Sequence, residues 1–505
     1  MRNAGYFEAL TRIAARRQQG TSAESLDLRN IGLKILPPEI GQLTSLARLD
    51  LAGNQLRTLP REIGCLSSLK SLDLSANPLR ALPAEFADLE ELEELNLSGN
   101  QFKTLPSAIV KLRSIKCLDL SGDQLAKSRL RALPFEIGQL ASLESLKLKY
   151  TGLKALPPTI GQLKSLKTLE LTYSSLRALP VEIGQLVSLN KLSLSGSRSM
   201  SIPSEFSQLN GLTELEVIGG LKGDWLPVIC QLKSLRELTL IHNYITSLPS
   251  EIGQLTSLQR LGVVKNRLTS LPSEIGNLTL LESLLIHRNR IESLPREIGN
   301  LTKLRQLHLL QNKLTNLPPQ IGELRNLGYL DISYNRLTDL PSEIGQLSSL
   351  TILYLMCNNI TSLPPTIGKL KSLKELNLNC NYLTEVPQEI GQISTLLKLS
   401  LFHNRLRKLP REMQRLKKLT ALYLQRNPNL GIPDEILGPD FLDVELEYKP
   451  DSIPTLPKEI LDYHFHLHPL RGDRVDSDIV PDEPSCRLCV RLRKRAVLNE
   501  HASDT

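Results

Sequence analysis

The residue types with the greatest chemical reactivity lie near the end of the sequence. Histidines alternate with other residues at 464–468, and a Cys486-x-x-Cys489 motif follows. Imidazole nitrogens and thiolates are the ligands that Zn²⁺ prefers, but a structural zinc site needs four of them at regular spacing. The run CRLCVRLRKR at 486–495 leaves two alternatives open, contact with an anionic membrane surface and S-acylation of the cysteines. We favour a solvated charged tail without a bound metal.

Catalysis would require a nucleophile and a base held in register, and the sequence offers no such pair. It also lacks the GxxxxGK[ST] loop that binds nucleotide phosphates. A ubiquitin ligase of the bacterial-effector kind would need a large helical domain with a nucleophilic cysteine, and the residues after Ile460 are too few for one. We therefore expect a protein that is not an enzyme and uses no cofactor. A role as the substrate-binding part of a ubiquitin-ligase system remains an alternative.

The remaining chemistry is that of binding, because large side chains recur beside regularly spaced leucines between residues 239 and 426. Aromatic, methionine and arginine side chains are typical anchors of protein interfaces, so we predict that a protein partner binds there. The alternative is that these positions vary freely and that the tyrosines only pack on one another. The candidate partner-binding residues are His242, Lys265, His287, Arg288, His308, Tyr329, Tyr334, Tyr354, Met356, Phe402, His403, Tyr423 and Arg426.

A repeat positions these candidates. The string SLARLDLAGNQLRTLPREIGCL at 45–66 returns in variants along the chain, and its strand leucine recurs every 23 residues, as at Leu49, Leu72 and Leu95. A period in this range is typical of a leucine-rich solenoid, in which each unit buries its apolar face against its neighbours. With strands about 4.8 Å apart, the predicted binding surface is about 40 Å long.

Within one unit, the residue types predict a short strand and a short helical turn. Leu49 and Leu51 alternate with polar or small residues, which indicates a strand with one buried face. Asn54 offers donors and an acceptor to backbone groups that a turning chain leaves unpaired, so we expect a ladder of asparagines, one per unit. Pro60 suits the start of a helix, and Gly64 is expected to let that helix stop. Stacked units predict an α/β solenoid, a leucine-rich-repeat horseshoe with a parallel concave sheet and short helical turns on the convex side.

The repeat divides the chain into three segments. Residues 1–24 are predicted to form an N-terminal capping helix, since terminal repeats need a cover. Residues 25–460 are predicted to form a leucine-rich-repeat solenoid of about 19 units. Residues 461–505 are expected to hold the remnant of a C-terminal cap and a disordered charged tail. The predicted buried face of the capping helix comprises Phe7, Leu10, Ile13 and Ala14.

The repeat is irregular near 120–230. Extra residues enter near 126–130, and the asparagine ladder lapses. Threonine and serine can keep part of the hydrogen bonding, whereas glycine cannot. We interpret the region as drift in a tolerant repeat, with a binding or hinge role as the alternative. The residues that replace the ladder asparagine are Asp123, Thr151, Ser174, Ser197 and Gly220.

Composition narrows the partners and the compartment. The net charge of +8 is modest for 505 residues, and the repeats carry no basic stripe interleaved with aromatics. We therefore do not expect the protein to bind nucleic acid. No apolar run is long enough to predict a transmembrane segment or a signal peptide. Seven scattered cysteines are typical of reduced thiols, which favours the cytoplasm. Cys357 and Cys380 stand one period apart, so we expect neighbouring thiols without a disulfide.

The unit LPxEIGxLxxLxxLxLxxNxL resembles the intracellular Ras-group leucine-rich repeats. That family includes Ras-suppressor, Scribble and Erbin proteins, plant intracellular Ras-group-related proteins, and repeats that precede bacterial Roc GTPase domains. Its repeats act as scaffolds for small GTPases or phosphatases, so the resemblance implies an interaction scaffold in intracellular signal transduction. The matching residues build the core and specify the fold rather than the ligand. A recognition module of an immune-receptor or effector type is the alternative.

Overall fold

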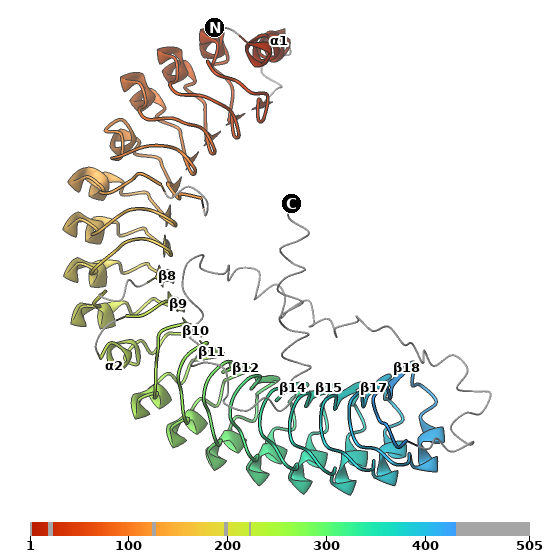
Figure 1. The fold of residues 1–505 in the computed structure, drawn as a ribbon. Coiled ribbons are helices and arrows are strands. Elements are labelled where there is room, and N and C mark those ends of the chain that lie inside the picture. Colours follow the sequence, from red (N-terminus) through yellow and green to blue (C-terminus); the bar gives the residue numbers. More distant parts are fainter. Residues whose placement is uncertain (1–2, 19–23, 124–127, 196–199, 222–223, 431–505) are drawn as a thin grey trace. The chain divides into compact units, whose positions relative to one another are not determined.

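The structure, a computed structural model, contains two compact units of parallel strands. Unit 1 comprises residues 1–268 with 272–285, and unit 2 comprises residues 269–271 with 286–505. In each unit the strands make one layer and short 3-10 turns make the opposite layer (Figure 1). The predicted α/β solenoid with a parallel sheet and short helical turns is confirmed. The residues that the structure describes are 3–18, 24–123, 128–195, 200–221 and 224–430.

Unit 1 holds both α-helices, α1 (Ala4–Gln18) and α2 (Leu226–Ile229). Its strands are β1 (Ser25–Asp27), β2 (Arg48–Asp50), β3 (Ser71–Asp73), β4 (Glu94–Asn96), β5 (Cys117–Asp119), β6 (Ser145–Lys147), β7 (Thr168–Leu171), β8 (Lys191–Ser195), β9 (Glu214–Ile218), β10 (Glu237–Ile241), β11 (Arg260–Val264) and β12 (Ser283–Leu285). Its 3-10 turns are η2 (Pro38–Gln42), η3 (Arg61–Cys65), η4 (Ala84–Asp88), η5 (Ile109–Lys111), η6 (Phe135–Gln139), η7 (Pro158–Gln162), η8 (Val181–Gln185), η9 (Ser204–Gln208), η10 (Ser250–Gln254) and η11 (Ser273–Asn277).

Unit 2 repeats the same elements without an α-helix among its described residues. Its strands are β13 (Gln306–His308), β14 (Tyr329–Asp331), β15 (Ile352–Tyr354), β16 (Glu375–Asn377), β17 (Lys398–Ser400) and β18 (Ala421–Tyr423). Its 3-10 turns are η12 (Arg296–Asn300), η13 (Pro319–Glu323), η14 (Ser342–Gln346), η15 (Pro365–Lys369), η16 (Gln388–Gln392) and η17 (Arg411–Arg415).

Neighbouring strands pair with an offset of one repeat. Leu49 pairs with Leu72 in unit 1, and Leu330 pairs with Leu353 in unit 2. These leucines are buried in the core. The residues on either side of each strand leucine lie on the opposite face of the strand, which we call the sheet face. The spacing that repeats the leucines therefore also aligns columns of side chains on the sheet face.

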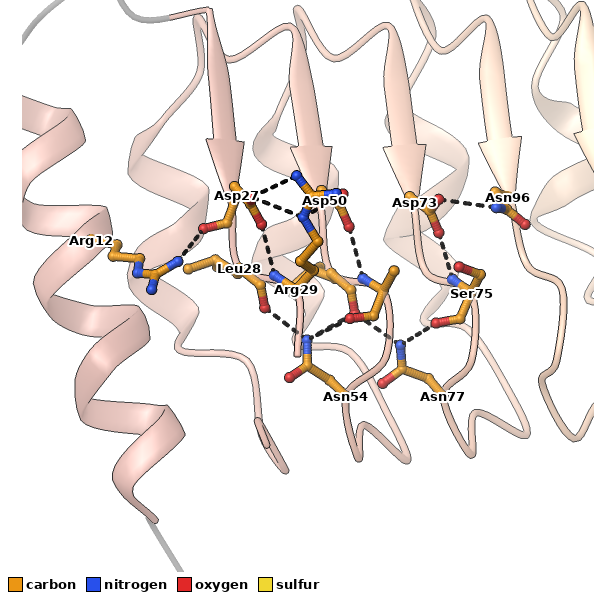
Figure 2. Close-up of polar contacts among 12 residues, drawn as sticks. Arg12, Asp27, Leu28, Arg29, Asp50, Asn54, Asp73, Ser75, Asn77 and Asn96 are labelled. Atoms are coloured by element: carbon orange, nitrogen blue, oxygen red, sulfur yellow. Dashed lines mark hydrogen bonds and ion pairs between the residues drawn. The ribbon is translucent and has the colours of Figure 1, made fainter. Parts of the chain in front are cut away.

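The asparagine ladder is confirmed. The Asn54 Nδ2 group donates to the carbonyls of Leu28 at 2.8 Å and Leu51 at 2.9 Å, and Oδ1 accepts from the Leu33 N–H at 2.9 Å. Asn77 makes the same set of bonds one repeat later. Figure 2 shows Asn54 donating to the Leu28 carbonyl, with Asn77 in the neighbouring repeat. Each buried asparagine thus pairs backbone groups of its own repeat and of the preceding one.

The ladder weakens where the sequence predicts its lapse. The Thr151 side chain is fully buried, and its Oγ1 keeps one bond, to the Leu148 carbonyl at 2.9 Å. The Ser174 hydroxyl is buried and has no hydrogen-bond partner within the described ranges, so the expectation that serine also keeps part of the bonding is wrong there. Strand β8 is longer than the strands that precede it, and α2 takes the place of a 3-10 turn. Residue 197 and residues 126–127 of the predicted insertion lie outside the described residues.

Gly64 has a different role from the predicted one. It lies inside η3, and its backbone is not in the left-handed conformation that a helix-ending glycine would need. A Cβ at this position would collide with the backbone carbonyl of Glu85 in the next 3-10 turn. Glycine is required because the turns of successive repeats approach each other closely, and the prediction that it ends the helix is wrong.

Helix α1 covers the first repeat with a face other than the predicted one. Phe7 is 59% exposed, Ala14 is exposed, and only Ile13 of the predicted set is buried. The helix is held by its N-terminus, where the Asn3 side chain donates to the Gly32 carbonyl at 2.6 Å and Gly5 packs against the backbone of the first repeat. This contact rotates the buried face, which comprises Gly5, Tyr6, Ala9 and Ile13.

The described part of the solenoid ends at Leu430. The predicted last repeat copy near 456–457, the C-terminal cap remnant, the charged tail and the Cys486-x-x-Cys489 motif lie outside the described residues. Cys357 and Cys380 are both buried.

Candidate functional site

The structure divides the predicted binding residues between the two units. His242 and Lys265 belong to unit 1, and the other eleven belong to unit 2. In unit 2 the strand registers align two columns on the sheet face. One runs Gln306, Tyr329, Ile352, Glu375, Lys398, Ala421, and the other runs His308, Asp331, Tyr354, Asn377, Ser400, Tyr423.

A chain of rings crosses the unit 2 sheet face. The rings of His287 and His308 are 6.5 Å apart between centroids, His308 stacks on Tyr329 at 4.6 Å, and Tyr329 meets Tyr354 edge to face at 5.8 Å. Aromatic pairs at these separations contribute about 0.5–1.5 kcal/mol beyond the burial of their area. Four of the predicted residues, His287, His308, Tyr329 and Tyr354, therefore form one packed cluster, which we call the ring cluster. His287, at 8% exposure, belongs to its floor rather than to its surface.

The ring cluster ends in a polar network. The Tyr354 hydroxyl donates to Glu375 Oε2 at 2.9 Å, and Lys398 Nζ lies 3.0 Å from Glu375 Oε1. Burial, and then the bond to the Glu375 carboxylate, raise the pKa of Tyr354. The hydroxyl therefore stays protonated and fixes the orientation of its ring.

Asp331 is a member of this site that the sequence analysis did not single out. Its side chain is 1% exposed, because His308 and Tyr354 flank it in the same column. Its Oδ1 accepts from the Ser333 N–H at 2.9 Å, and burial raises its pKa to about 6. Asp50 and Asp73 occupy the same column in unit 1 and accept the equivalent backbone N–H. The recurrence of aspartate in this column could have been recognised in the sequence. The burial of Asp331 could not.

Asp331 and His308 make opposite contributions to the pH dependence of stability. Burial raises the pKa of Asp331 from 3.8 to about 6. Its contribution to the free energy of unfolding therefore falls as the pH rises from about 4 to about 6. Burial lowers the pKa of His308 from 6.5 to about 4. Its contribution to the free energy of unfolding therefore rises as the pH rises from about 4 to 6.5. The two slopes oppose each other between about pH 4 and 6.

We predict that Asp331→Asn makes the free energy of unfolding increase with pH, relative to the wild type, by roughly 2–3 kcal/mol between pH 4 and 6.5. His308→Gln should give a change of similar size and opposite sign, because only the Asp331 slope remains. Urea unfolding at both pH values measures the two slopes. Identical slopes in both variants and the wild type would contradict the prediction.

Several predicted residues lie at the end of the strand, in left-handed backbone conformation. These residues directly precede the ladder asparagine, and their φ angles fall between 53° and 60°. A left-handed non-glycine residue costs about 1–2 kcal/mol. Gly53 and Gly99 occupy this column in the first repeats. Their presence was the sequence indication that the column adopts a left-handed backbone. The predicted residues in it are His242, Lys265, Arg288, Tyr334, His403 and Arg426.

The two cysteines share this left-handed column. Cys357 and Cys380 follow Tyr334 in it and are followed by His403. Met356 and Phe402 stand beside this column on the sheet face, where both are half-buried. The Arg426 guanidinium lies 5.4 Å from the centre of the Phe402 ring. The second half of unit 2 therefore adds apolar and cationic groups to the ring cluster.

Unit 1 has smaller ring contacts of its own. The His242 Nε2 atom lies 3.1 Å from the Tyr244 hydroxyl, and Lys265 stands one repeat later in the left-handed column. Tyr150 and Tyr173 stack at 4.7 Å within the irregular region. These contacts are not continuous with one another along the described strands.

The first repeats of unit 1 carry an acidic column instead of rings. Asp27, Asp50 and Asp73 follow the strand leucines, and Arg29 lies 2.9 Å from Asp27 and 3.7 Å from Asp50 (Figure 2). Asn96 donates to Asp73 Oδ2 at 3.0 Å. These carboxylates accept hydrogen bonds from backbone N–H groups and contact neighbouring side chains, so they stabilise the ends of the strands.

The described residues offer neither a metal-binding cluster nor a membrane-spanning helix. No group of three or more histidine, cysteine, aspartate or glutamate side chains in that part of the chain could hold a metal ion. No helix there is long and apolar enough to cross a bilayer.

Comparisons with known proteins agree with the repeat. A family profile described as a leucine-rich repeat region matches residues 124–225, 219–313 and 293–382. Leucine-rich-repeat profiles also match 21–79 with 371–428, and 91–112. No curated protein matches the chain.

Solved structures supply three informative likenesses. A leucine-rich-repeat protein of Leptospira interrogans is 33% identical, with 89% of this chain and 99% of that chain covered and a TM-score of 0.63. The plant peptide hormone receptor RGFR1 in complex with RGF2 is 29% identical, with 82% and 80% covered and a TM-score of 0.57. The Arabidopsis receptor kinase HAESA ectodomain in complex with an IDA peptide hormone is 26% identical, with 82% and 72% covered and a TM-score of 0.53.

Proposed function

Because this chain belongs to the leucine-rich-repeat family, a fold suited to protein–protein interaction, we propose that it is a non-catalytic scaffold of intracellular signal transduction. Its proposed partner is a small GTPase, a regulator of one, or a phosphatase. The resemblance of its repeat unit to the Ras-group repeats supports that class of partner. The seven cysteines scattered along the sequence support a cytoplasmic location.

One observation carries the proposal, the ring cluster of the unit 2 sheet face. His308, Tyr329 and Tyr354 of this cluster are half-buried, so they present an edge to a partner while their neighbours hold them in place. Rigid aromatic side chains lose little conformational entropy when a partner covers them. Interfaces concentrate their binding energy in such residues. The cluster therefore combines the residue types and the preorganisation that a binding surface needs.

A triple variant tests the surface. Tyr329→Ala, Tyr354→Ala and Phe402→Ala together should abolish capture of the partner by the full chain, as measured by affinity purification with mass spectrometry. The matched control is Phe135→Ala, since Phe135 lies on a 3-10 turn of unit 1 and is 66% exposed. Circular dichroism should be unchanged in both variants. Undiminished binding by the folded triple variant would contradict the proposal.

A second measurement tests the class of partner. The purified partner, if it is a small GTPase, should bind the chain with an affinity that differs between its GDP and GTP-analogue states. Equal affinity in both states would argue against a GTPase effector or regulator role.

The likeness to peptide-hormone receptors favours a second function, a recognition module of the immune-receptor or effector type. One of the similar structures is a plant peptide hormone receptor in complex with RGF2, and another is a receptor ectodomain in complex with a peptide hormone. In this alternative the sheet face binds a foreign or secreted polypeptide regardless of nucleotide. The substrate-binding part of a ubiquitin-ligase system is a third reading, which recovery of ligase subunits with the chain would favour.

A further inference from the structure

A column of three cations borders the unit 2 sheet face. Arg290, Lys313 and Arg336 each follow a ladder asparagine in successive repeats. Their loops are held together, because the Lys313 N–H donates to the Ile291 carbonyl at 2.9 Å and the Arg336 N–H donates to the Leu314 carbonyl at 2.8 Å. We call these three residues the basic column.

No member of the basic column forms an ion pair within the described residues of unit 2, although Glu292 and Asp339 stand in the same loops as Arg290 and Arg336. The ion pairs of that unit join other residues, such as Lys398 with Glu375 and Lys408 with Glu385, and none includes a member of the column. Arg405 stands at the equivalent position three repeats after Arg336, and its guanidinium lies 4.4 Å from the centre of the Tyr382 ring. The three members of the column lack such a ring contact.

The surroundings of the column are also basic. Arg288 is bonded to Gln311 at 2.9 Å, and Arg426 lies over Phe402. On the sheet face and in the two adjoining loop columns, the only acidic residues of the described unit 2 are Asp331, which is buried, and Glu375, which pairs with Lys398. The basic residues there are Arg288, Arg290, Lys313, Arg336, Lys398, Arg405 and Arg426.

Three like charges on neighbouring loops repel one another, because adjacent strands of a sheet are only about 4.8 Å apart. An anion laid along the column removes that repulsion and gains charge-assisted hydrogen bonds from the guanidinium groups. The matching ligand is extended and carries several carboxylates at intervals comparable to the strand spacing. A polypeptide segment rich in aspartate meets this requirement.

We propose that the basic column binds the acidic segment 473–483 of the same chain, DRVDSDIVPDE. This segment holds five carboxylates, at Asp473, Asp476, Asp478, Asp482 and Glu483, against the single cation Arg474. Its Val475, Ile479 and Val480 offer apolar groups to the rings beside the column. The acidic residues at 434–447 are interspersed with the apolar residues of the fraying repeat, so we assign them to the predicted end of the solenoid.

The chain is long enough for this contact. Asp473 lies 43 residues after Leu430 (473 minus 430), the last described residue, and 43 extended residues span at most about 150 Å. Within unit 2, from the loop of Asn427 back to that of Asn289, six repeat spacings amount to about 30 Å. The linker therefore does not prevent the segment from reaching the column.

The contact would regulate access to the unit 2 surface, and it goes beyond the proposed function because it does not depend on the identity of the partner. A tethered segment acts at an effective concentration of about 1 mM. If the free segment binds with a Kd of about 100 μM, the tether weakens the binding of an external acidic ligand by about tenfold. Neutralising the segment then exposes the column.

The experiment measures binding of a fluorescein-labelled peptide of residues 472–485 to the full chain by fluorescence anisotropy. The neutral-tail variant carries Asp473→Asn, Asp476→Asn, Asp478→Asn, Asp482→Asn and Glu483→Gln. It should bind the peptide about tenfold more tightly than the wild type does. Addition of Arg290→Gln, Lys313→Gln and Arg336→Gln to the neutral-tail variant should remove the gain.

The control matches the charge change at exposed positions elsewhere in unit 2. Lys303→Gln, Arg325→Gln and Lys418→Gln in the neutral-tail background should leave peptide binding unchanged. Equal affinity of the wild type and the neutral-tail variant would overturn the proposal, since the segment would then not occupy the column. Full retention of binding after loss of the three column charges would also overturn it. Neither result bears on the aromatic triple variant, so failure here is distinguishable from failure of the proposed function.

Discussion

Replacing Asn335 with alanine should lower the free energy of unfolding by about 3–5 kcal/mol. The Asn335 Nδ2 group donates to the carbonyls of Leu309 and Ile332, both at 2.9 Å, and Oδ1 accepts from the Leu314 N–H at 3.0 Å. Alanine leaves these buried backbone groups without partners, and each unsatisfied buried group costs about 1–3 kcal/mol. Urea unfolding followed by circular dichroism measures the change.

The control for this variant is Asn316→Ala, in the same repeat region of unit 2. Asn316 is exposed and makes no side-chain hydrogen bond in the described structure, so its loss should change the free energy of unfolding by less than about 0.5 kcal/mol. A destabilisation below about 1 kcal/mol for Asn335→Ala would show that water or a backbone shift satisfies the freed groups.

Gly368→Ala should destabilise unit 2 by about 2–3 kcal/mol. Gly368 lies in η15, and a Cβ there would collide with the Glu389 carbonyl of η16 and lie 2.8 Å from the Glu389 Cβ. The obstacle includes backbone, so the two turns would have to separate and give up packing between repeats. Thermal unfolding of the full chain measures the loss.

Gly328→Ala is the matched control, because a Cβ at Gly328 meets its nearest atom, the Arg305 carbonyl oxygen, at 3.7 Å. That separation is an ordinary contact. The control should be neutral or stabilising by up to about 1 kcal/mol, since alanine restricts the unfolded chain. Equal effects of the two substitutions would indicate that glycine in the 3-10 turns is kept for reasons other than close approach.

The irregular region of unit 1 persists although it has lost hydrogen bonds of the asparagine ladder. There Thr151 keeps one ladder bond and Ser174 keeps none through its hydroxyl. A solenoid tolerates such losses because each repeat is stabilised mainly by its immediate neighbours. The cost therefore stays local and need not unfold the rest of the unit.

The candidate site could be predicted only in part. The sequence predicted which aromatic and cationic residues share the columns of the sheet face, because they stand at fixed offsets from the strand leucine. It did not separate those on the strand, such as Tyr329, from those in left-handed conformation, such as Tyr334. Offsets alone do not reveal backbone conformation, and Gly53 and Gly99 were the only hint. The binding role of the surface stays a prediction.

The sequence by itself determined the repeat, the parallel strands, the buried leucines and the asparagine ladder. These features depend on contacts within one repeat and with the next, so a local pattern repeated every 23 residues suffices to specify them. The tertiary structure alone decided which face of α1 is buried, why Gly64 must be glycine, and which side chains meet across strands. Asp331 is buried because its column neighbours are bulky, and the three charges of the basic column lie side by side only because their repeats stack. Such properties belong to the alignment of several repeats, and no single repeat contains them.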